Sequence, residues 1–213
     1  MGGGWVWLGR FPETRSSPKR RHDMSERFLK SPGDPRKLLA YKKAEIIYLL
    51  TYRFCERFLR KGDRTIDQMV QAARSGKQNI IEGVEAAVTS KETEIKLINV
   101  ARASLGELLE DYRDYLATRG LAIWEKESEK AVFVRKKSRN PEADYETFRE
   151  FVETRSDEVV ANIAVCLIYQ CRYLLERLLK QREEAFRSGG GLRERMTHVR
   201  LEARRQKRPG GTG

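Results

Sequence analysis

Residues 67–83 read DQMVQAARSGKQNIIEG, and this stretch decides the fold because its pattern is helical although a glycine stands in its middle. Apolar residues recur at helical spacing on both sides of Gly76. A glycine inside a helix costs about 1 kcal/mol relative to alanine, so its presence usually has a packing or functional reason. Because Ala72, Ala73 and Ser75 are also small, the stretch predicts one helical turn that a neighbouring helix approaches closely.

Four long amphipathic segments extend outward from this stretch and predict four helices. The first ends before Gly62, where a glycine suits a helix C-terminus. The third begins at Thr89, because Thr89 and Glu92 have the spacing of a capping box, and it stops at Gly120. The predicted helices cover residues 38–61, 65–87, 89–119 and 156–186.

The links between the first three predicted helices are short, which implies antiparallel neighbours. The sequence therefore predicts an all-α fold, an antiparallel up-and-down four-helix bundle. A longer connection spans residues 120–155, where Asn140 and Pro141 suit an N-cap and a first helical position. We expect a short extra helix at residues 141–153, before the fourth long helix. Trp124 and the patch AVFV at residues 131–134 give this connection an apolar surface for docking.

The composition limits the classes of protein to consider. A chain of 213 residues has room for one domain of ordinary size plus tails. The most apolar segment, residues 161–169, is shorter than the ~20 residues that span a bilayer, and the N-terminal apolar run is too short for a signal peptide. We therefore expect a cytoplasmic protein with no membrane contact. Cys55, Cys166 and Cys171 lack CxxC spacing and predict buried thiols, not a zinc site.

The formal charge of +12 is concentrated at the two ends of the chain. Residues 1–37 hold nine Lys and Arg against four Asp and Glu, residues 188–213 hold seven against two, and residues 38–187 hold twenty-seven against twenty-five. We predict a disordered basic N-terminal extension (1–37), a four-helix bundle (38–187), and a Gly-rich hinge with a basic C-terminal tail (188–213). Met24 offers an alternative start of the chain.

The C-terminal tail is the predicted nucleic-acid contact, since Lys and Arg side chains neutralise phosphates. The alternative is a solubilising tail without a specific ligand. The candidate nucleic-acid-binding residues are Arg193, Arg195, Arg200, Arg204, Arg205, Lys207 and Arg208.

The stretch at 67–83, followed by ARASLGELLEDYRDYLATRG at 101–120, resembles the family of small four-helix-bundle proteins encoded in intervening sequences of 23S ribosomal RNA genes. Relatives of that family include the accessory variability protein of diversity-generating retroelements. The resemblance implies an antiparallel bundle, often a ring of five subunits, without enzymatic activity; in the retroelement relatives the ring engages a reverse transcriptase and nucleic acid. The matching residues are Gln68, Ala72, Ala73, Asn79, Ile80, Glu82, Gly83, Ala101, Arg102, Ser104, Leu105, Glu107 and Leu108.

This sequence departs from the family pattern in two respects. Its connection at residues 120–155 is longer than in the simplest members, and its positive charge lies in the tails, whereas the retroelement relatives are strongly basic over the bundle. A bundle with an added C-terminal element is what a distinct subgroup would show.

Catalytic signals are weak. His22 and His198 lie in the tails, so the bundle offers no Ser-His or Cys-His pair, and no Gly-rich phosphate loop is present. A carboxylate stripe on the third helix lacks the Glu-x-x-His motif of di-metal bundles, and we interpret it as a solvated face or as an acidic surface that meets a basic one on a neighbouring subunit. We therefore expect no enzyme, no cofactor and no metal. The stripe comprises Glu107, Glu110, Asp111 and Asp114.

Two further groups of polar residues have predicted structural roles. Asn79, Glu82 and Arg102 lie beside apolar stripes and are predicted to form a polar network between the second and third helices, the alternative being a ligand site. A second group, beside cationic residues of the first helix, is predicted to form a subunit interface, where tyrosine is enriched. The alternative for this group is stacking on nucleic acid. Its members are Tyr41, Tyr48 and Tyr52.

These observations favour a non-enzymatic homo-oligomeric scaffold, with a pentameric ring as one form, that binds nucleic acid, RNA being the expected ligand, through its basic tails. Oligomerisation would raise the avidity of weak tails without any new contact. The alternative is a protein-interaction module whose ring docks a partner polypeptide while the tails only keep it in solution.

Overall fold

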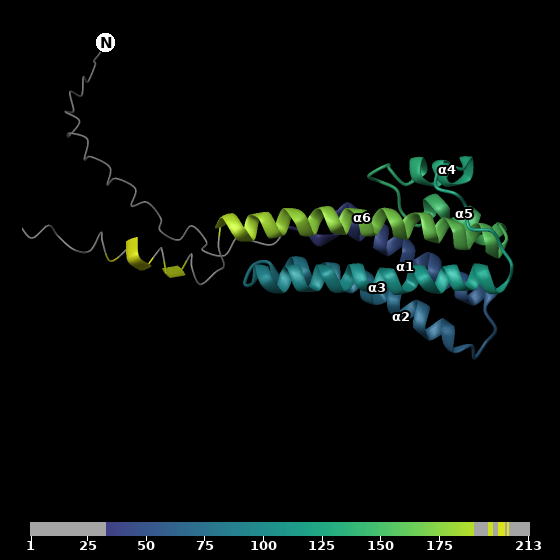
Figure 1. The fold of residues 1–213 in the computed structure, drawn as a ribbon, viewed down its shortest axis with the longest axis horizontal. Coiled ribbons are helices and arrows are strands. Elements are labelled where there is room, and N and C mark those ends of the chain that lie inside the picture. The colour runs from purple at the N-terminus through teal and green to yellow at the C-terminus, as the bar shows by residue number, and fades with distance from the viewer. Residues whose placement is uncertain (1–32, 190–195, 198–199, 203, 205–213) are drawn as a thin grey trace, which may run out of the picture. The chain divides into compact units, whose positions relative to one another are not determined.

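A computed structural model describes residues 33–189, 196–197, 200–202 and 204, and the elements within these ranges are all helices (Figure 1). The finding confirms the predicted all-α class, and all of the described residues belong to one unit that spans residues 31–213. In chain order, the elements are the 3-10 helix η1 (Pro35–Lys37) and the α-helices α1 (Leu39–Phe58), α2 (Arg64–Ala86), α3 (Lys91–Thr118), α4 (Glu129–Lys137), α5 (Glu146–Thr154) and α6 (Asp157–Gly189).

Local capping signals set the ends of the long helices. The side chain of Asp63 accepts a hydrogen bond from the backbone N–H of Thr65 (2.9 Å) and starts α2. The N-cap of α3 lies one residue later than predicted, because Ser90, and not Thr89, caps the helix by accepting from the N–H of Thr93 (3.1 Å). Gly62 (φ 90°) and Gly120 (φ 64°) adopt the left-handed conformation that follows α1 and α3, a conformation that glycine adopts at little cost.

The predicted tails begin further from the bundle than the sequence suggested. The extension was expected to reach residue 37, but η1 forms at Pro35–Lys37, where the Asp34 side chain accepts from the N–H of Arg36 (3.0 Å). At the other end, Ser188 and Gly189 continue α6, and the Ser188 hydroxyl donates to the Glu184 carbonyl (2.9 Å). Residues 1–32, and most of the C-terminal tail, lie outside the described residues.

The connection between α3 and α6 contains two short helices where one was predicted. Helix α5 begins at Glu146 and not at Pro141, because Asn140 accepts from the N–H of Glu142 (3.0 Å) and closes only a turn. Helix α4, which the sequence did not predict, begins after Ser128, whose hydroxyl accepts from the N–H of Ala131 (3.4 Å). The patch at residues 131–134 therefore lies on a helix.

Each long helix packs against two others: α1 against α2 and α6, and α3 against α2 and α6. Figure 1 shows α4 and α5 lying beside α6, away from α2. The core is made of side chains from all four long helices, with Phe54 of α1 stacked edge-on against Tyr112 (5.1 Å between ring centroids) and Tyr115 (4.8 Å) of α3.

Helices α2 and α3 run in opposite directions and approach most closely at the small residues of the opening stretch. A Cβ atom placed on Gly76 would lie 2.8 Å from both Cγ and Cδ2 of Leu105. Seven residues further along α2, a Cβ on Gly83 would lie 3.0 Å from Cδ1 of Ile98, which is seven residues earlier on α3. At Gly76 the two helices therefore lie close together, with Leu105 of α3 against the α2 backbone.

Helix α6 is central to the packing. By length and composition alone, residues 157–188 could cross a bilayer, but 61% of the most apolar window is already buried inside the protein. One such helix is weak evidence for a membrane span, because the core helix of a globular protein has the same composition. No other helix among the described residues passes this test.

Candidate functional site

The connection between α3 and α6 is held against the bundle by side chains from α1 and α6. Lys43 of α1 is buried and donates from Nζ to the carbonyl of Ser138 at the end of α4 (2.6 Å), and burial lowers the pKa of its ammonium group. The Ser138 hydroxyl in turn donates to Oε1 of Gln170 on α6 (2.6 Å). Lys42 donates to the carbonyl of Pro141 (2.8 Å). These bonds fix the C-terminal end of α4.

The start of the connection is fixed by Asn162, a buried side chain of α6. Its Oδ1 accepts from the backbone N–H of Trp124 (2.8 Å), and its Nδ2 donates to the carbonyl of Ala122 (2.8 Å). This pair of bonds to the backbone sets the position of the Trp124 indole. The indole Nε1 is buried and has no hydrogen-bond partner among the described residues, which is unusual for a buried tryptophan.

Helix α5 is tied to α1 by ionic contacts. Arg53 donates from Nε and Nη2 to the carboxylate of Glu153 (2.9 and 2.8 Å), and this pairing lowers the pKa of Glu153. Arg57 donates to the carbonyl of Val152 at the end of α5. Together with the bonds that hold α4, these contacts place two short helices on either side of an apolar hollow.

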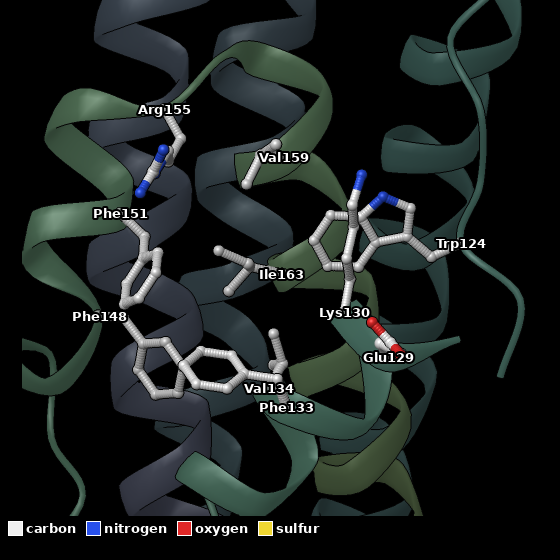
Figure 2. A pocket seen from close by; sticks show the side chains of 10 residues that line it. All are labelled: Trp124, Glu129, Lys130, Phe133, Val134, Phe148, Phe151, Arg155, Val159 and Ile163. Carbon is white, nitrogen blue, oxygen red and sulfur yellow. The ribbon is translucent and has the colours of Figure 1, made fainter. Parts of the chain in front are cut away.

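This hollow, which we name the α4 groove, has a volume of about 630 Å³ and is formed by α4, α5, the start of α6 and Trp124 (Figure 2). Figure 2 shows Val159 and Ile163 of α6 between Trp124 on one side and the phenylalanine rings on the other. Phe133 is 51% exposed and packs edge-on against Phe151 (5.9 Å between centroids). The lining residues are Trp124, Glu129, Lys130, Phe133, Val134, Phe148, Phe151, Arg155, Val159 and Ile163.

Cations border the aromatic rings of the α4 groove. Nζ of Lys130 lies 5.5 Å from the centroid of the Trp124 ring, and Nζ of Lys137 lies 5.6 Å from that of Phe151. Arg155 lines the groove at the end of α5. Within the described part of the chain, Lys130, Lys137 and Arg155 have no carboxylate within 4.0 Å. The groove therefore combines an apolar floor with three bordering cations that have no ion-pair partner among the described residues, and with one acidic lining residue, Glu129.

A second hollow of about 560 Å³, which we name the α4–α6 cavity, also has Trp124 in its wall. Its walls come from α4, from α6 and from the segment before α4. Cys166 lines it as a half-buried free thiol, whose pKa is raised by burial to about 11. The other two cysteines, Cys55 and Cys171, are free and buried as expected, and burial raises the pKa of each to about 12.

The predicted nucleic-acid residues fall mostly beyond the described ranges. Arg200 and Arg204 are described and are exposed in helical segments. The other five, Arg193, Arg195, Arg205, Lys207 and Arg208, lie outside the described residues, as do His22 and His198. Only Arg200 and Arg204 of this set therefore have a described position.

The predicted tyrosine stripe on α1 does not form one exposed surface. Tyr41 is 5% exposed and belongs to the core, where its hydroxyl donates to Oε1 of Glu45 (3.0 Å). Tyr48 is half-buried beneath Nζ of Lys77, which lies 4.5 Å from the ring centroid. Tyr52 alone is largely exposed. Tyr41 is therefore corrected to a core residue, and an interface could use only the outer part of the stripe.

The polar link between α2 and α3 differs from the predicted network. Asn79 donates to the carbonyl (2.9 Å) and the hydroxyl (3.1 Å) of Ser75, and the Ser75 hydroxyl bonds that of Ser104 on α3 (2.9 Å). Arg102 instead donates to Asn99 on its own helix (2.9 Å), and Glu82 is exposed. Of the three predicted members only Asn79 takes part, because serines placed at the close approach of the helices can reach each other directly.

The carboxylate stripe of α3 is mostly solvated. Glu107, Glu110 and Asp114 are exposed, and Glu110 pairs with Arg113 (2.9 Å). Asp111 is half-buried, and burial together with the charges of Asp114 and Glu107 raises its pKa. No group of three or more His, Cys, Asp or Glu side chains in the described ranges could hold a metal ion.

The sequence indicated some of the apolar residues of the α4 groove but not its bordering cations. Trp124 and residues 131–134 were expected to dock, and of these Trp124, Ala131, Phe133 and Val134 line one or both of the hollows. The bordering cations were not recognised, because Arg155 and Lys130 come from different elements and meet only in the folded chain.

Comparison of this chain with protein-family models, with curated proteins and with solved structures finds no match.

Proposed function

We propose that this protein is a non-enzymatic scaffold, an antiparallel up-and-down four-helix bundle, whose α4 groove binds an acidic segment of a partner polypeptide. The observation that carries the proposal is the pairing of an open apolar groove with three cations that have no carboxylate partner among the described residues. The opposite directions of α2 and α3, which follow from the contacts of Gly76 and Gly83, support the antiparallel arrangement.

The composition of the groove suits a bulky apolar anchor flanked by acidic residues. Aromatic side chains that are exposed in the free protein and surround a hollow are typical of the energetic centre of protein interfaces. Phe133 is such a side chain here, and the half-buried Trp124 also lines the groove. Carboxylates beside the anchor would meet Lys130, Lys137 and Arg155, which raises the association rate and selects against basic partners.

Labelled peptides can test whether the groove needs both the acidic residues and the apolar anchor of a partner segment. A short fluorescent peptide with Leu and Trp among Asp and Glu residues is titrated with the full chain, beside a matched peptide in which Lys replaces each acid. We expect the acidic peptide alone to bind, and Phe133→Asp to weaken it at least about tenfold, because a carboxylate then faces the peptide's own charges. Val100→Asp, at a comparably exposed apolar residue of α3, is the control and should leave binding unchanged.

Two results would contradict this function. Equal binding of the acidic and basic peptides would show that the bordering cations do not select the partner. Unchanged affinity of the Phe133→Asp variant, with a normal melting temperature, would place any binding outside the α4 groove.

A second candidate function is nucleic-acid binding by the C-terminal tail of an oligomeric, ring-forming scaffold. It is favoured by the excess of seven Lys and Arg over two Asp and Glu at residues 188–213, and by the exposure of Arg200 and Arg204. Self-association of the bundle, for which Tyr52 and Leu49 of α1 offer exposed apolar area, would bring several tails together. The ring-forming bundle is what the family resemblance implies, whereas the basic tail departs from the pattern of that family.

A salt series with a labelled structured RNA tests the second candidate. The full chain is compared with a chain that ends at Arg187. If the tail binds phosphates, truncation should reduce the affinity and make its salt dependence shallower, by about 0.7 to 0.9 in logarithmic slope for each phosphate that the tail would otherwise neutralise. Equal and negligible binding by both chains would discard nucleic acid as the ligand and leave the α4 groove as the binding site.

A further inference from the structure

The α4–α6 cavity has the dimensions of a small-molecule site. Its volume of about 560 Å³ lies within the range of roughly 300 to 1,000 Å³ that holds drug-sized ligands. It lies between two helices and has few polar groups, as such sites usually do. The lining residues are Ile123, Trp124, Lys126, Ala131, Arg135, Val165, Cys166, Tyr169, Gln170 and Tyr173.

The long walls of the cavity are apolar and partly open. Ile123 and Tyr169 are 47% and 46% exposed, and Tyr173 of α6 is exposed as well. Val165, by contrast, is buried in the wall. A bound acyl or aryl group would cover this apolar surface, at about 25 cal/mol for each Å² removed from water.

The charged groups of the wall are both cations. Lys126 and Arg135 line the cavity, and no acidic residue does. Gln170, the neutral polar residue, is already bonded within the protein: its Oε1 accepts from Ser138 (2.6 Å), and its Nε2 donates to the Arg135 carbonyl (3.4 Å). Arg135 is the group best placed to hold a ligand's charge, because its side chain is 23% exposed, whereas that of Lys126 is 87% exposed.

The existing partners of Arg135 leave it able to bind an anion. Its Nη1 donates to the carbonyl of Lys126, and its Nη2 lies 3.5 Å from Oε2 of Glu127, whose side chain is 77% exposed. A long ion pair to an exposed carboxylate contributes little stability, so a ligand carboxylate could replace Glu127. Arg135 and Cys166 both line the cavity; burial raises the pKa of the Cys166 thiol, and the guanidinium charge of Arg135 opposes that effect.

We propose that the α4–α6 cavity binds an anionic amphiphile, with its carboxylate on Arg135 and its apolar body against Ile123, Val165, Tyr169 and Tyr173. This site is separate from the α4 groove, although Trp124 borders both. If the acidic peptide fails to bind the α4 groove, the proposal for the cavity still stands. If decanoate fails to bind the cavity, the proposed function of the groove still stands.

Isothermal titration of the full chain with sodium decanoate, below its micelle-forming concentration, tests the proposal. We expect one saturable site, and at least about tenfold weaker binding of decyltrimethylammonium, which has the same chain length and the opposite charge. Arg135→Gln should weaken decanoate at least about tenfold, the effect of removing a charge-assisted hydrogen bond. Lys136→Gln removes the same charge from the next residue, which is exposed and does not line the cavity, and should leave the affinity within about twofold.

The Cys166 thiol gives an independent readout of the same cavity. Decanoate should slow the alkylation of Cys166 by N-ethylmaleimide, followed by mass spectrometry, in the wild type and not in Arg135→Gln. Arg135→Lys keeps a positive charge and should recover part of the protection, which separates loss of the charge from loss of folding.

Three results would overturn the proposal. The first is decanoate binding without protection of Cys166, which would place the ligand elsewhere. The second is equal affinity for decanoate and decyltrimethylammonium, which would show that Arg135 does not select an anion. The third is protection of Cys166 by the acidic peptide and not by decanoate, which would make the cavity part of a polypeptide-binding surface.

Discussion

Replacing Gly76 by leucine is expected to destabilise the protein by about 3 kcal/mol, at the upper end of typical overpacking effects. Even a Cβ atom at this position would lie 2.8 Å from Cγ and Cδ2 of Leu105, well inside van der Waals contact. Leu105 is fully buried and cannot move away without displacing other core side chains. Urea denaturation of the purified variant, with the wild type at equal concentration, measures the destabilisation.

Two matched variants identify the cause of that destabilisation. Gly106→Ala adds a Cβ whose nearest neighbour is Cζ of Arg172 at 3.6 Å, so we expect it to stabilise α3 by up to about 1 kcal/mol through helix propensity alone. Leu105→Ala opens space beside Gly76, and Gly76→Ala should therefore cost less in the Leu105→Ala background than in the wild type. An unchanged melting temperature for Gly76→Leu would contradict the close approach of α2 and α3.

The sequence predicts this helix contact because its signal is local. Four small residues within one helical turn have few explanations other than a close neighbour, and the contact with Leu105 agrees with that interpretation. The cap of α3 is harder to place, since Thr89 and Ser90 are both good capping residues and only the folded chain shows which hydroxyl meets the N–H of Thr93.

Features that depend on distant residues could not be predicted in the same way. Helix α4 is short and is anchored by Lys43, which bonds Ser138 from 95 positions away. Its own sequence carries three cations in the last turn and little apolar periodicity. Tyr41 shows the same limit, because its spacing from Tyr48 suggests one face of α1, yet burial along that face depends on neighbours that the helix sequence does not contain.

A second large effect is expected at the ion pair of Glu94 and Arg182, which joins the start of α3 to the end of α6. Glu94 is 3% exposed, and its Oε1 lies 2.6 Å from Nε of Arg182, although the two atoms are not aligned as a hydrogen bond. Arg182→Met removes the charge and keeps much of the side-chain bulk. We expect a loss of roughly 2 to 3 kcal/mol, because a buried carboxylate is left without its cation; Arg182 is partly exposed, which places the loss below that of a fully buried pair.

The pH dependence distinguishes this ionic cause from a change in packing. Burial raises the pKa of Glu94, and Arg182 is the main group that lowers it, so the pKa should rise further in Arg182→Met. A carboxyl whose pKa is higher in the folded than in the unfolded state stabilises the fold when it is protonated, and this contribution is lost as the pH rises through the folded-state pKa. The deficit of the variant should therefore be larger at pH 8 than at pH 5, as measured by urea denaturation at both values. As a control, Lys180→Met breaks the exposed ion pair with Glu176 on the same helix and should cost no more than about 0.5 kcal/mol at either pH. If the stability deficit of Arg182→Met does not change with pH, the loss comes from packing alone.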